Sequence, residues 1–462
     1  MQTTKLARYL NLIAWLSLFC VLSVYAYVAS GFFASGVQSP ADGDGVYFDT
    51  YSVERGSPLK IYLHGLTDVS GTIYRLTSGK VPISEIRVKA PTADEQTRYF
   101  DYHSGYSSTS ALEFDTSELV SGYYLLESRS ESGQSSVAPF VVYDRTCEGI
   151  QIVAPTYTWL AYNPYIKSNY MDERPWNQQL GQALLDKGWW LYDQIASRLF
   201  KMETELKSFP VQLPYHKPIR FADGLSSQEN SRFYKKNSHL LEIEWELLEF
   251  LELNDVDYCV LDDRSFSQYS FNTESDMLVF NGHSEYWSEA MLKSLDKQLD
   301  LNKKILFTGG NNIFRQVEEY EHGIVVIKQK MDMEQTTVRI GAFYDPQGYG
   351  TYAPLKILEP DHWLFDGIEK EEIGFETFKS ASPDEPGGVS GHETDKSNQF
   401  SVGFSRLATG TNPNRGGADL MYRQQGENGW IINLGSLSFT SGIFKDPDIE
   451  RIFTNIFLGD KK

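Results

Sequence analysis

The pattern of hydrophobic and polar positions divides the chain into three regions. Residues 1–36 combine Lys5 and Arg8 with a mostly apolar, uncharged run from Leu10 to Phe33, which is long enough to span a bilayer as a helix. Because basic flanking residues stay in the cytoplasm, this run predicts a single-pass membrane protein with an extracytoplasmic body. The alternative is a signal peptide cleaved near Val24-Tyr25-Ala26, which would leave a secreted or periplasmic protein.

Residues 45–146 consist of short segments in which apolar and polar side chains alternate. Examples are "LKIYLHG", "GTIYRLT", "ALEFDTS", "GYYLLESRS" and "APFVVYD". Turn residues separate such segments about every ten positions, which predicts an antiparallel β-sandwich. The region shows no cluster of titratable side chains, so we expect it to support the rest of the chain or to contact a partner.

Residues 149–460 change to strands followed by helices, which predicts a layered α/β domain with a mainly parallel sheet. The expected strands are "IQIVAP", "DYCVLDD", "SDMLVFNGH" and "KKILFTGGNN". The segment "HLLEIEWELLEFLELN" has apolar residues at helical spacing and acidic residues on the other face. A second helix, "SEAMLKSLDKQLDLN", has Ser288 as its expected N-cap.

The segment "FNGHSEYW", residues 280–287, follows one of these strands, at the sheet edge where open α/β proteins bind ligands. It resembles the G-x-S-x-G nucleophile elbow but has Tyr286 in place of the last glycine, so Ser284 is not favoured as a nucleophile. The remaining candidates in this segment are the imidazole of His283, the carboxylate of Glu285 and the phenol of Tyr286. These groups suit metal binding or acid–base chemistry. The alternative is a packed loop that satisfies its polar groups internally.

Composition narrows the range of partners. The 462 residues include 42 basic and 62 acidic side chains, a net charge of -20, which repels phosphate backbones and argues against nucleic acid as a partner. The extracytoplasmic body contains Cys147 and Cys259, which form either one disulfide or two separate core thiols. No cysteine follows Cys259, which falls inside an expected strand, so a cysteine nucleophile is excluded there.

Three segments resemble a known family in their order and spacing. "APTYTWLAYN" (154–163), "FNGHSEYW" and "KILFTGGNNIFRQV" (304–317) are similar to the C-terminal domain of the N,N-dimethylformamidase large (beta) subunit family. "SGYYLLE" and "APFVVYD" resemble the end of the sandwich domain that precedes it, so the resemblance covers roughly residues 45–460. It implies a fold related to class I glutamine amidotransferases without their thiol, and an iron ion held by two tyrosines and one glutamate.

Carried over residue by residue, the resemblance implies metal ligands at Tyr162 and Glu285. It also implies a catalytic role for His283 beside Glu285. Phenolate and carboxylate oxygens suit ferric iron, which acts as a Lewis acid on an amide carbonyl or activates a bound water. The implied reaction is hydrolysis of a small amide or another C–N bond.

The second tyrosine ligand of the family is not found. The corresponding element appears as "RFADGLS" (220–226), with Leu225 where the phenol is expected. Tyr215 is one alternative, and His216 or Asp223 could supply a different third donor and so favour a different metal. A further alternative is a degenerate site retained for structure.

Other residues have two interpretations each. His362 resembles a family element or is a satisfied loop residue. Gly309 and Gly310 could present N–H groups to an oxyanion or could only permit a tight turn. Trp159 and Trp287 would line a cleft or lie in the core.

The leading hypothesis is a metal-assisted hydrolase of small amides, and the alternative is a catalytically inactive binding or assembly module at the cell surface. A homo-oligomer or a partner subunit stays open. Convergence of Tyr162, His283 and Glu285 would distinguish the two hypotheses.

Overall fold

The computed structural model describes residues 45–459 except 67, 90–99, 102–104, 107–111, 132, 134, 147, 164–210, 218, 220–239, 269–276, 376 and 378–386. The predicted anchor or signal peptide, residues 1–36, lies outside the described residues. Among those described, no helix is both long and apolar enough to cross a membrane. To that extent the prediction of a single-pass membrane protein is contradicted, and it is withdrawn.

The N-terminal part forms two sheets, with strand orders β1-β3-β8 and β2-β10-β9-β4-β5. All pairings within these two sheets are antiparallel except that between β2 and β10. The alternating segments of the sequence supply these strands, and their apolar positions are buried. The strands are β1 (Gly45–Phe48), β2 (Ser52–Glu54), β3 (Leu59–His64), β4 (Val69–Leu76), β5 (Lys80–Val88), β8 (Leu112–Phe114), β9 (Gly122–Ser130) and β10 (Ser135–Tyr143), with a small hairpin of β6 (Phe100–Asp101) and β7 (Gly105–Tyr106).

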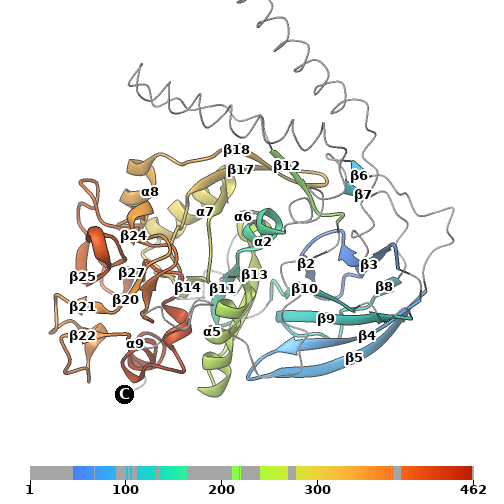
Figure 1. Ribbon diagram of the computed structural model, residues 1–462, viewed down its shortest axis with the longest axis horizontal. Helices are drawn as coiled ribbons and strands as arrows, with labels where there is room; N and C mark the ends of the chain where they lie inside the picture. The colour runs from blue at the N-terminus through green and yellow to red at the C-terminus, as the bar shows by residue number, and fades with distance from the viewer. Residues whose placement is uncertain are drawn as a thin grey trace, which may run out of the picture.

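The C-terminal part is built on a nine-stranded sheet of order β13-β11-β14-β16-β27-β26-β25-β21-β22 (Figure 1). The first five strands are parallel, and each later pairing is antiparallel. The strands are β11 (Ile150–Ala154), β13 (Tyr258–Asp262), β14 (Met277–Phe280), β16 (Lys304–Phe307), β21 (Leu355–Ile357), β22 (Glu372–Ile373), β25 (Ser405–Gly410), β26 (Asp419–Gln425) and β27 (Gly429–Asn433).

The predicted mainly parallel α/β domain is therefore wrong, because the sheet is mixed and the structure has more strand (40%) than helix (23%). The difference lies in the connections after β16. A parallel pair needs a crossover of a dozen or more residues, whereas β26 and β27 are joined by a short turn and must run antiparallel.

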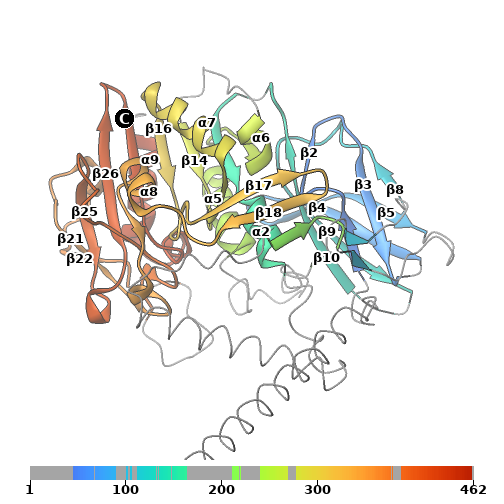
Figure 2. The ribbon, with the colours of Figure 1, turned by 90° about the horizontal axis from the view of Figure 1, so that it is seen from above.

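A second sheet lies beside the first and has the order β12-β18-β17-β15. Figure 2 shows the β17–β18 hairpin reaching across toward β12. The pairing of β15 with β17 is parallel and sets Tyr286 opposite Arg315, directly after Glu285. The strands are β12 (Val211–Pro214), β15 (Tyr286–Ser288), β17 (Arg315–Tyr320) and β18 (Gly323–Lys328), and two small pairs are β19 (Phe343–Tyr344) with β24 (Asp395–Lys396) and β20 (Tyr352–Ala353) with β23 (Ser390–Gly391).

The two helices predicted from the sequence are both present. One of them buries acidic side chains that the sequence pattern placed on its polar face. Ser288 caps α7 as predicted, since its hydroxyl accepts a hydrogen bond from the Met291 N–H at 3.2 Å. The acidic residues of α5 are not solvent-facing, and Glu244 and Glu246 are buried. The helices are α2 (Thr156–Tyr162), α5 (Leu241–Leu253), α6 (Asp263–Gln268), α7 (Glu289–Asp300), α8 (Met333–Ile340) and α9 (Pro447–Leu458), with single turns η3 (Pro346–Gly348), η4 (Trp363–Phe365), η5 (Pro413–Arg415) and η6 (Thr440–Gly442).

The sandwich and the larger sheet share one continuous hydrophobic core. The Ser52 hydroxyl donates to Asp262 Oδ2 at 2.6 Å, and the Val260 N–H donates to the Ser121 hydroxyl at 2.7 Å. Figure 1 shows α5 between the two parts. The Trp245 side chain of this helix donates to the Thr77 carbonyl of the sandwich, and Glu252 accepts from Arg75 at 3.0 Å. Cys259, inside β13, is disulfide-bonded, and Cys147 lies outside the described residues.

Candidate functional site

The site forms where β11, β14 and β16 end at the same edge of the parallel half of the sheet. Tyr162 ends the helix that follows β11, His283 and Glu285 follow β14, and Asn311 follows β16. Parallel strands place the segments after them side by side, so the sequence correctly placed the motif at the carboxyl edge of the sheet. Glu393 joins it from the turn between β23 and β24.

Glu285 is held at both carboxylate oxygens and is almost fully buried, with 1% of its surface exposed. Its Oε1 lies 2.6 Å from Arg315 Nε, and its Oε2 accepts a hydrogen bond from the Tyr162 phenol at 2.8 Å. Its backbone N–H donates to the Thr158 hydroxyl at 3.2 Å, and its carbonyl accepts from the N–H of Phe314 and of Arg315. The carboxylate therefore has one fixed orientation.

His283 is completely buried between two carboxylates. Its Nε2 lies 3.0 Å from Glu393 Oε2 and 3.5 Å from Glu285 Oε2. Burial lowers the pKa of His283, but the two glutamates outweigh that effect and the net shift is upward. Burial alone would raise the pKa of the Glu393 carboxyl. The charge of His283 and a hydrogen bond from Asn311 outweigh burial and bring that pKa down to about 2. The geometry thus favours an imidazolium beside a carboxylate.

Tyr162 is in ring contact with His283, with centroids 5.2 Å apart. Burial raises the pKa of its phenol, and the charges of Glu285 and Glu393 raise it further. The phenol is therefore protonated in this environment and donates to Glu285. A nearby cation would be needed to stabilise the phenolate.

Asp395 fixes the loop after β16 against the segment that carries Glu393. It is fully buried and accepts hydrogen bonds from the Asn311 N–H at 2.7 Å and from Asn312 Nδ2 at 3.0 Å. Asn311 in turn donates its side-chain amide to Glu393 at 2.8 Å. This network connects segments that are distant in sequence, and it sets the separation between Glu393 and His283.

Sequence reasoning missed Glu393, Arg315 and Asn311. The sequence contains a weak signal for Glu393. The segment Gly391-His392-Glu393 has the same order of glycine, histidine and acid as the segment 282–285, but without the intervening serine. Arg315 and Asn311 lie within the segment that carries the family resemblance, but neither spacing nor periodicity marks them. Their roles depend on the β15–β17 pairing and on the turn after β16.

Ser284 and the two tryptophans belong to the core. The indole N–H of Trp287 donates to the Ser284 carbonyl at 2.9 Å and lies 3.1 Å from its hydroxyl. Trp159 is fully buried, and its N–H donates to Glu244 at 2.9 Å. His283 faces glutamates rather than Ser284, so the arrangement is not that of a serine nucleophile with its base.

The alternative third donors do not join the site within the described residues. Tyr215 packs edge-on against Tyr51 with ring centroids 5.6 Å apart, and His216 packs against Tyr62 at 5.0 Å. No contact of either with Tyr162 or Glu285 is found there. Asp223 and Leu225 lie outside the described residues.

At Gly309 and Gly310 the backbone lies so close to neighbouring carbonyl groups that a side chain would not fit. A Cβ at Gly309 would lie 2.0 Å from the Gly282 carbonyl oxygen, and one at Gly310 would lie 2.4 Å from that of Glu393. His362 is remote from the site: it accepts a hydrogen bond from the Leu364 N–H at the start of η4. The loop interpretation of that histidine fits its position.

The donor chemistry at the site fits an oxygen-loving cation in part. The Tyr162 and Glu285 oxygens lie 2.8 Å apart, so one ion at a metal–oxygen distance of about 2 Å could contact both. Arg315 occupies the other oxygen of Glu285. Among the described residues, no group of three or more His, Cys, Asp or Glu side chains is arranged to hold a metal ion. The two side chains that the family resemblance implies as ligands, Tyr162 and Glu285, thus lie next to each other.

The site combines a buried histidine between two oriented carboxylates with a phenol at the carboxyl edge of the sheet. The family model of the N,N-dimethylformamidase beta subunit-like C-terminal region matches residues 60–449, and the chain belongs to this family of dimethylformamidase-like hydrolases. That match spans both the sandwich and the larger sheet. The suspected family is confirmed.

Other comparisons add little. A search of curated proteins found no match. Among solved structures, a cycloisomaltooligosaccharide glucanotransferase from a Paenibacillus species, complexed with cycloisomaltoheptaose, is 12% identical, with 68% of this chain and 61% of that chain covered and a TM-score of 0.16. The chain thus spans less than two thirds of that structure, and a likeness at this score indicates neither fold nor function.

Proposed function

We propose that this protein hydrolyses the C–N bond of a small amide at Tyr162, His283 and Glu285, with an iron ion held by Tyr162 and Glu285. The observation that carries the proposal is the convergence of these three side chains in a member of the dimethylformamidase-like family. When bound, the iron would supply Lewis acidity to the amide carbonyl or to a water molecule.

The roles of the protein side chains follow from their contacts. Water adds its oxygen to the carbonyl carbon, the C–N bond breaks, and the leaving nitrogen must gain a proton. His283 is suited to deliver that proton, because Glu393 and Glu285 raise its pKa and keep it protonated. The proton released by the attacking water restores the imidazolium, so atoms and charge balance over the cycle.

Positioning residues keep this constellation rigid. Arg315 fixes Glu285 through Oε1, and Asn311 fixes Glu393. The side chains are removed from bulk water, which strengthens each electrostatic interaction. Because His283 is fully buried and Glu285 nearly so, the site suits a compact substrate rather than a polymer.

One observation favours the alternative of an inactive binding module. The charges of Arg315 and protonated His283 balance those of Glu285 and Glu393, so the cluster is electroneutral without a metal ion. A balanced buried network can be retained for structure, since removing one partner leaves an unpaired charge.

The test is to measure the metal content of the purified full-length protein, the release of amine from N,N-dimethylformamide and N-methylformamide, and the release of ammonia from formamide and acetamide. Iron bound at one equivalent per chain, with saturable release of amine or ammonia from at least one amide, supports the proposal. A protein that retains no stoichiometric metal and releases neither amine nor ammonia from any of the four substrates would instead support the inactive module.

A further inference from the structure

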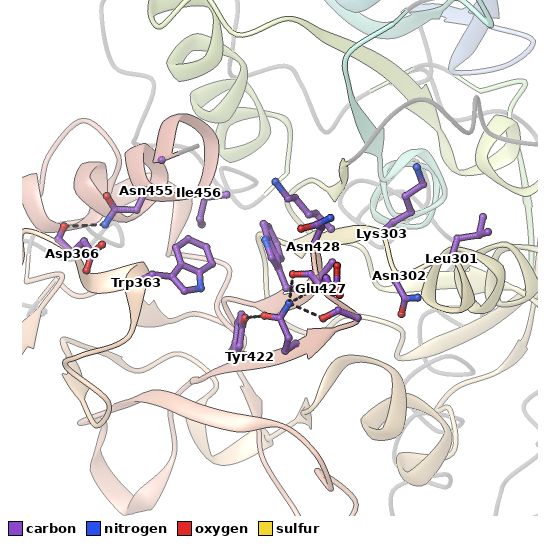
Figure 3. Close-up of a pocket in the computed structure, with 16 residues that line it drawn as sticks. Leu301, Asn302, Lys303, Trp363, Asp366, Tyr422, Glu427, Asn428, Asn455 and Ile456 are labelled. Atoms are coloured by element: carbon purple, nitrogen blue, oxygen red, sulfur yellow. Dashed lines mark hydrogen bonds between the residues drawn. The ribbon is translucent and has the colours of Figure 1, made fainter. Parts of the chain in front are cut away.

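A cavity lies at the opposite end of the nine-stranded sheet from the candidate site. Its volume is about 1000 Å³, and it is lined by the first residue of β16, the start of β27, the end of β26, η4 and α9 (Figure 3). Lys304 opens β16 at this cavity, whereas the loop of the candidate site begins after Phe307. The strand between them is about 10 Å long. The cavity is therefore separate from the proposed hydrolase site.

One wall of this cavity is aromatic. The ring centroid of Trp363 lies 6.0 Å from that of Trp430 and 6.3 Å from that of Tyr422, and the planes are tilted to each other. The Tyr422 hydroxyl donates to Gln424, whose Nε2 donates to the Gly429 carbonyl at 2.9 Å. These bonds hold Tyr422 in one arrangement within the β26–β27 hairpin.

The two tryptophans also offer hydrogen-bond donors. Within the described residues, neither the Trp363 nor the Trp430 indole N–H has an acceptor. Trp430 is only 6% exposed, yet its indole nitrogen is not among the fully buried side-chain atoms without a partner, so this N–H is open to solvent. A ligand oxygen in the cavity would replace water as its acceptor.

Polar side chains also line the cavity. Figure 3 shows Trp363 and Tyr422 on one side of the hollow and Asn302 and Lys303 on the other, with Asn428 between them. Amide groups can donate to one hydroxyl and accept from its neighbour, which matches a pair of adjacent hydroxyls.

The charges at the cavity oppose a strongly charged ligand. Two lysines, Lys303 and Lys304, and two acids, Asp366 and Glu427, line it, so their formal charges cancel. The acids disfavour an anion. A quaternary ammonium ion needs aromatic rings spaced around it, whereas these rings contact each other.

We propose that this cavity binds a neutral oligosaccharide, which is a function separate from amide hydrolysis. The apolar C–H face of a sugar ring packs on Trp363 or Tyr422, and its hydroxyls exchange hydrogen bonds with the indole N–H groups and the asparagines. The volume lies at the upper end of small-ligand sites, about 300–1,000 Å³, so it accommodates more than one sugar unit.

The experiment titrates full-length protein with maltotriose, cellotriose and N,N′,N″-triacetylchitotriose, following tryptophan fluorescence and heat. We expect saturable binding of at least one trisaccharide in the micromolar to millimolar range. Trp363→Ala removes the stacking surface and weakens that binding about tenfold or more. Trp430→Phe keeps an aromatic ring and removes only the N–H, and it weakens binding to a smaller degree.

The matched control is Phe444→Ala, which removes an exposed aromatic side chain outside the cavity and leaves trisaccharide affinity unchanged. Circular dichroism and the thermal midpoint establish that each variant is folded, and amide turnover reports separately on the hydrolase site. Absence of saturable binding for all three trisaccharides overturns the proposal. Affinity that is equal in folded Trp363→Ala and in the parent also overturns it.

Discussion

Nε2 of His283 lies 3.0 Å from Oε2 of Glu393, although the two residues belong to different halves of the larger sheet region. Glu393 is held by Asn311, and Asp395 ties the same segment to the loop after β16. This contact gives His283 a fixed orientation and a charged partner. In many hydrolase sites a carboxylate orients a histidine and stabilises its protonated form.

Glu393→Gln tests this relationship. The substitution keeps the shape of the side chain and an oxygen for Asn311 but removes the charge beside His283. We expect kcat for amide hydrolysis to fall about 100-fold with KM and metal content nearly unchanged, because the proton donor is affected and the proposed ligands are not. Exposed Glu289→Gln is the control and keeps parental kinetics. Unaltered kcat in Glu393→Gln would exclude a role for the pair in the reaction.

The buried carboxyl of Glu244 should make the free energy of unfolding depend on pH. Burial raises the pKa of this carboxyl from 4.5 to about 8, although hydrogen bonds from Trp159 and Tyr123 act in the opposite direction. A carboxyl whose pKa is raised by folding contributes stability that is fully present below its unfolded value. That contribution is lost as the pH rises through the folded value. The parent should therefore lose a few kcal/mol of unfolding free energy between pH 4.5 and pH 8 through this group.

Glu244→Gln removes the ionisation and retains an oxygen that accepts from Trp159. We expect the unfolding free energy of this variant to decline less than that of the parent across the same pH interval. Chemical denaturation at several pH values measures the difference, with Glu289→Gln as an exposed control that follows the parent. Parallel curves for the parent and Glu244→Gln would show that the buried carboxyl does not titrate in this range.

Gly282 has a steric role that can be separated from its backbone strain. Its φ is +69°, and a Cβ there would lie 2.5 Å from Glu244 Cγ. Gly350 has the same φ with nothing within 4 Å of its Cβ position, so it is a matched control. We expect Gly350→Ala to cost about 1 kcal/mol from strain, and Gly282→Ala to cost roughly 3 kcal/mol or more. Equal losses in a urea titration would mean that the contact with Glu244 is relieved without cost.

Local patterns predicted the first half of the larger region well. Strands β11, β13, β14 and β16 and helices α5 and α7 all follow from apolar periodicity, and the Ser288 cap follows from residue type. The position of His283 and Glu285 at the sheet edge follows from the same reasoning. These features depend on residues that are close together in the sequence.

The remaining features depend on contacts between distant segments. The antiparallel half of the sheet arises from hairpins such as β26–β27, whose strand pairing periodicity does not specify. The pattern placed the acidic residues of α5 on a polar face, but Glu244 and Glu246 are buried. Trp245 of the same helix donates to the Thr77 carbonyl of the sandwich at 2.6 Å. Glu393 lies beside His283 because the folded sheet brings two segments together that are distant in the sequence. Such pairings are tertiary, and a single sequence carries little signal for them.

The proposed ligand and proton-donor roles are separated by Glu285→Gln and His283→Ala. Glu285→Gln removes an anionic oxygen that meets the Tyr162 phenol, so we expect metal content to be lost together with activity. His283→Ala removes the proton donor but neither proposed ligand, so metal should stay bound while kcat falls at least about 100-fold. Metal analysis and amine release are measured on the same folded preparations. If both variants bind as much metal as the parent and lose only thermal stability, the cluster is a packed polar loop, in which each buried group left unpaired costs about 1–3 kcal/mol.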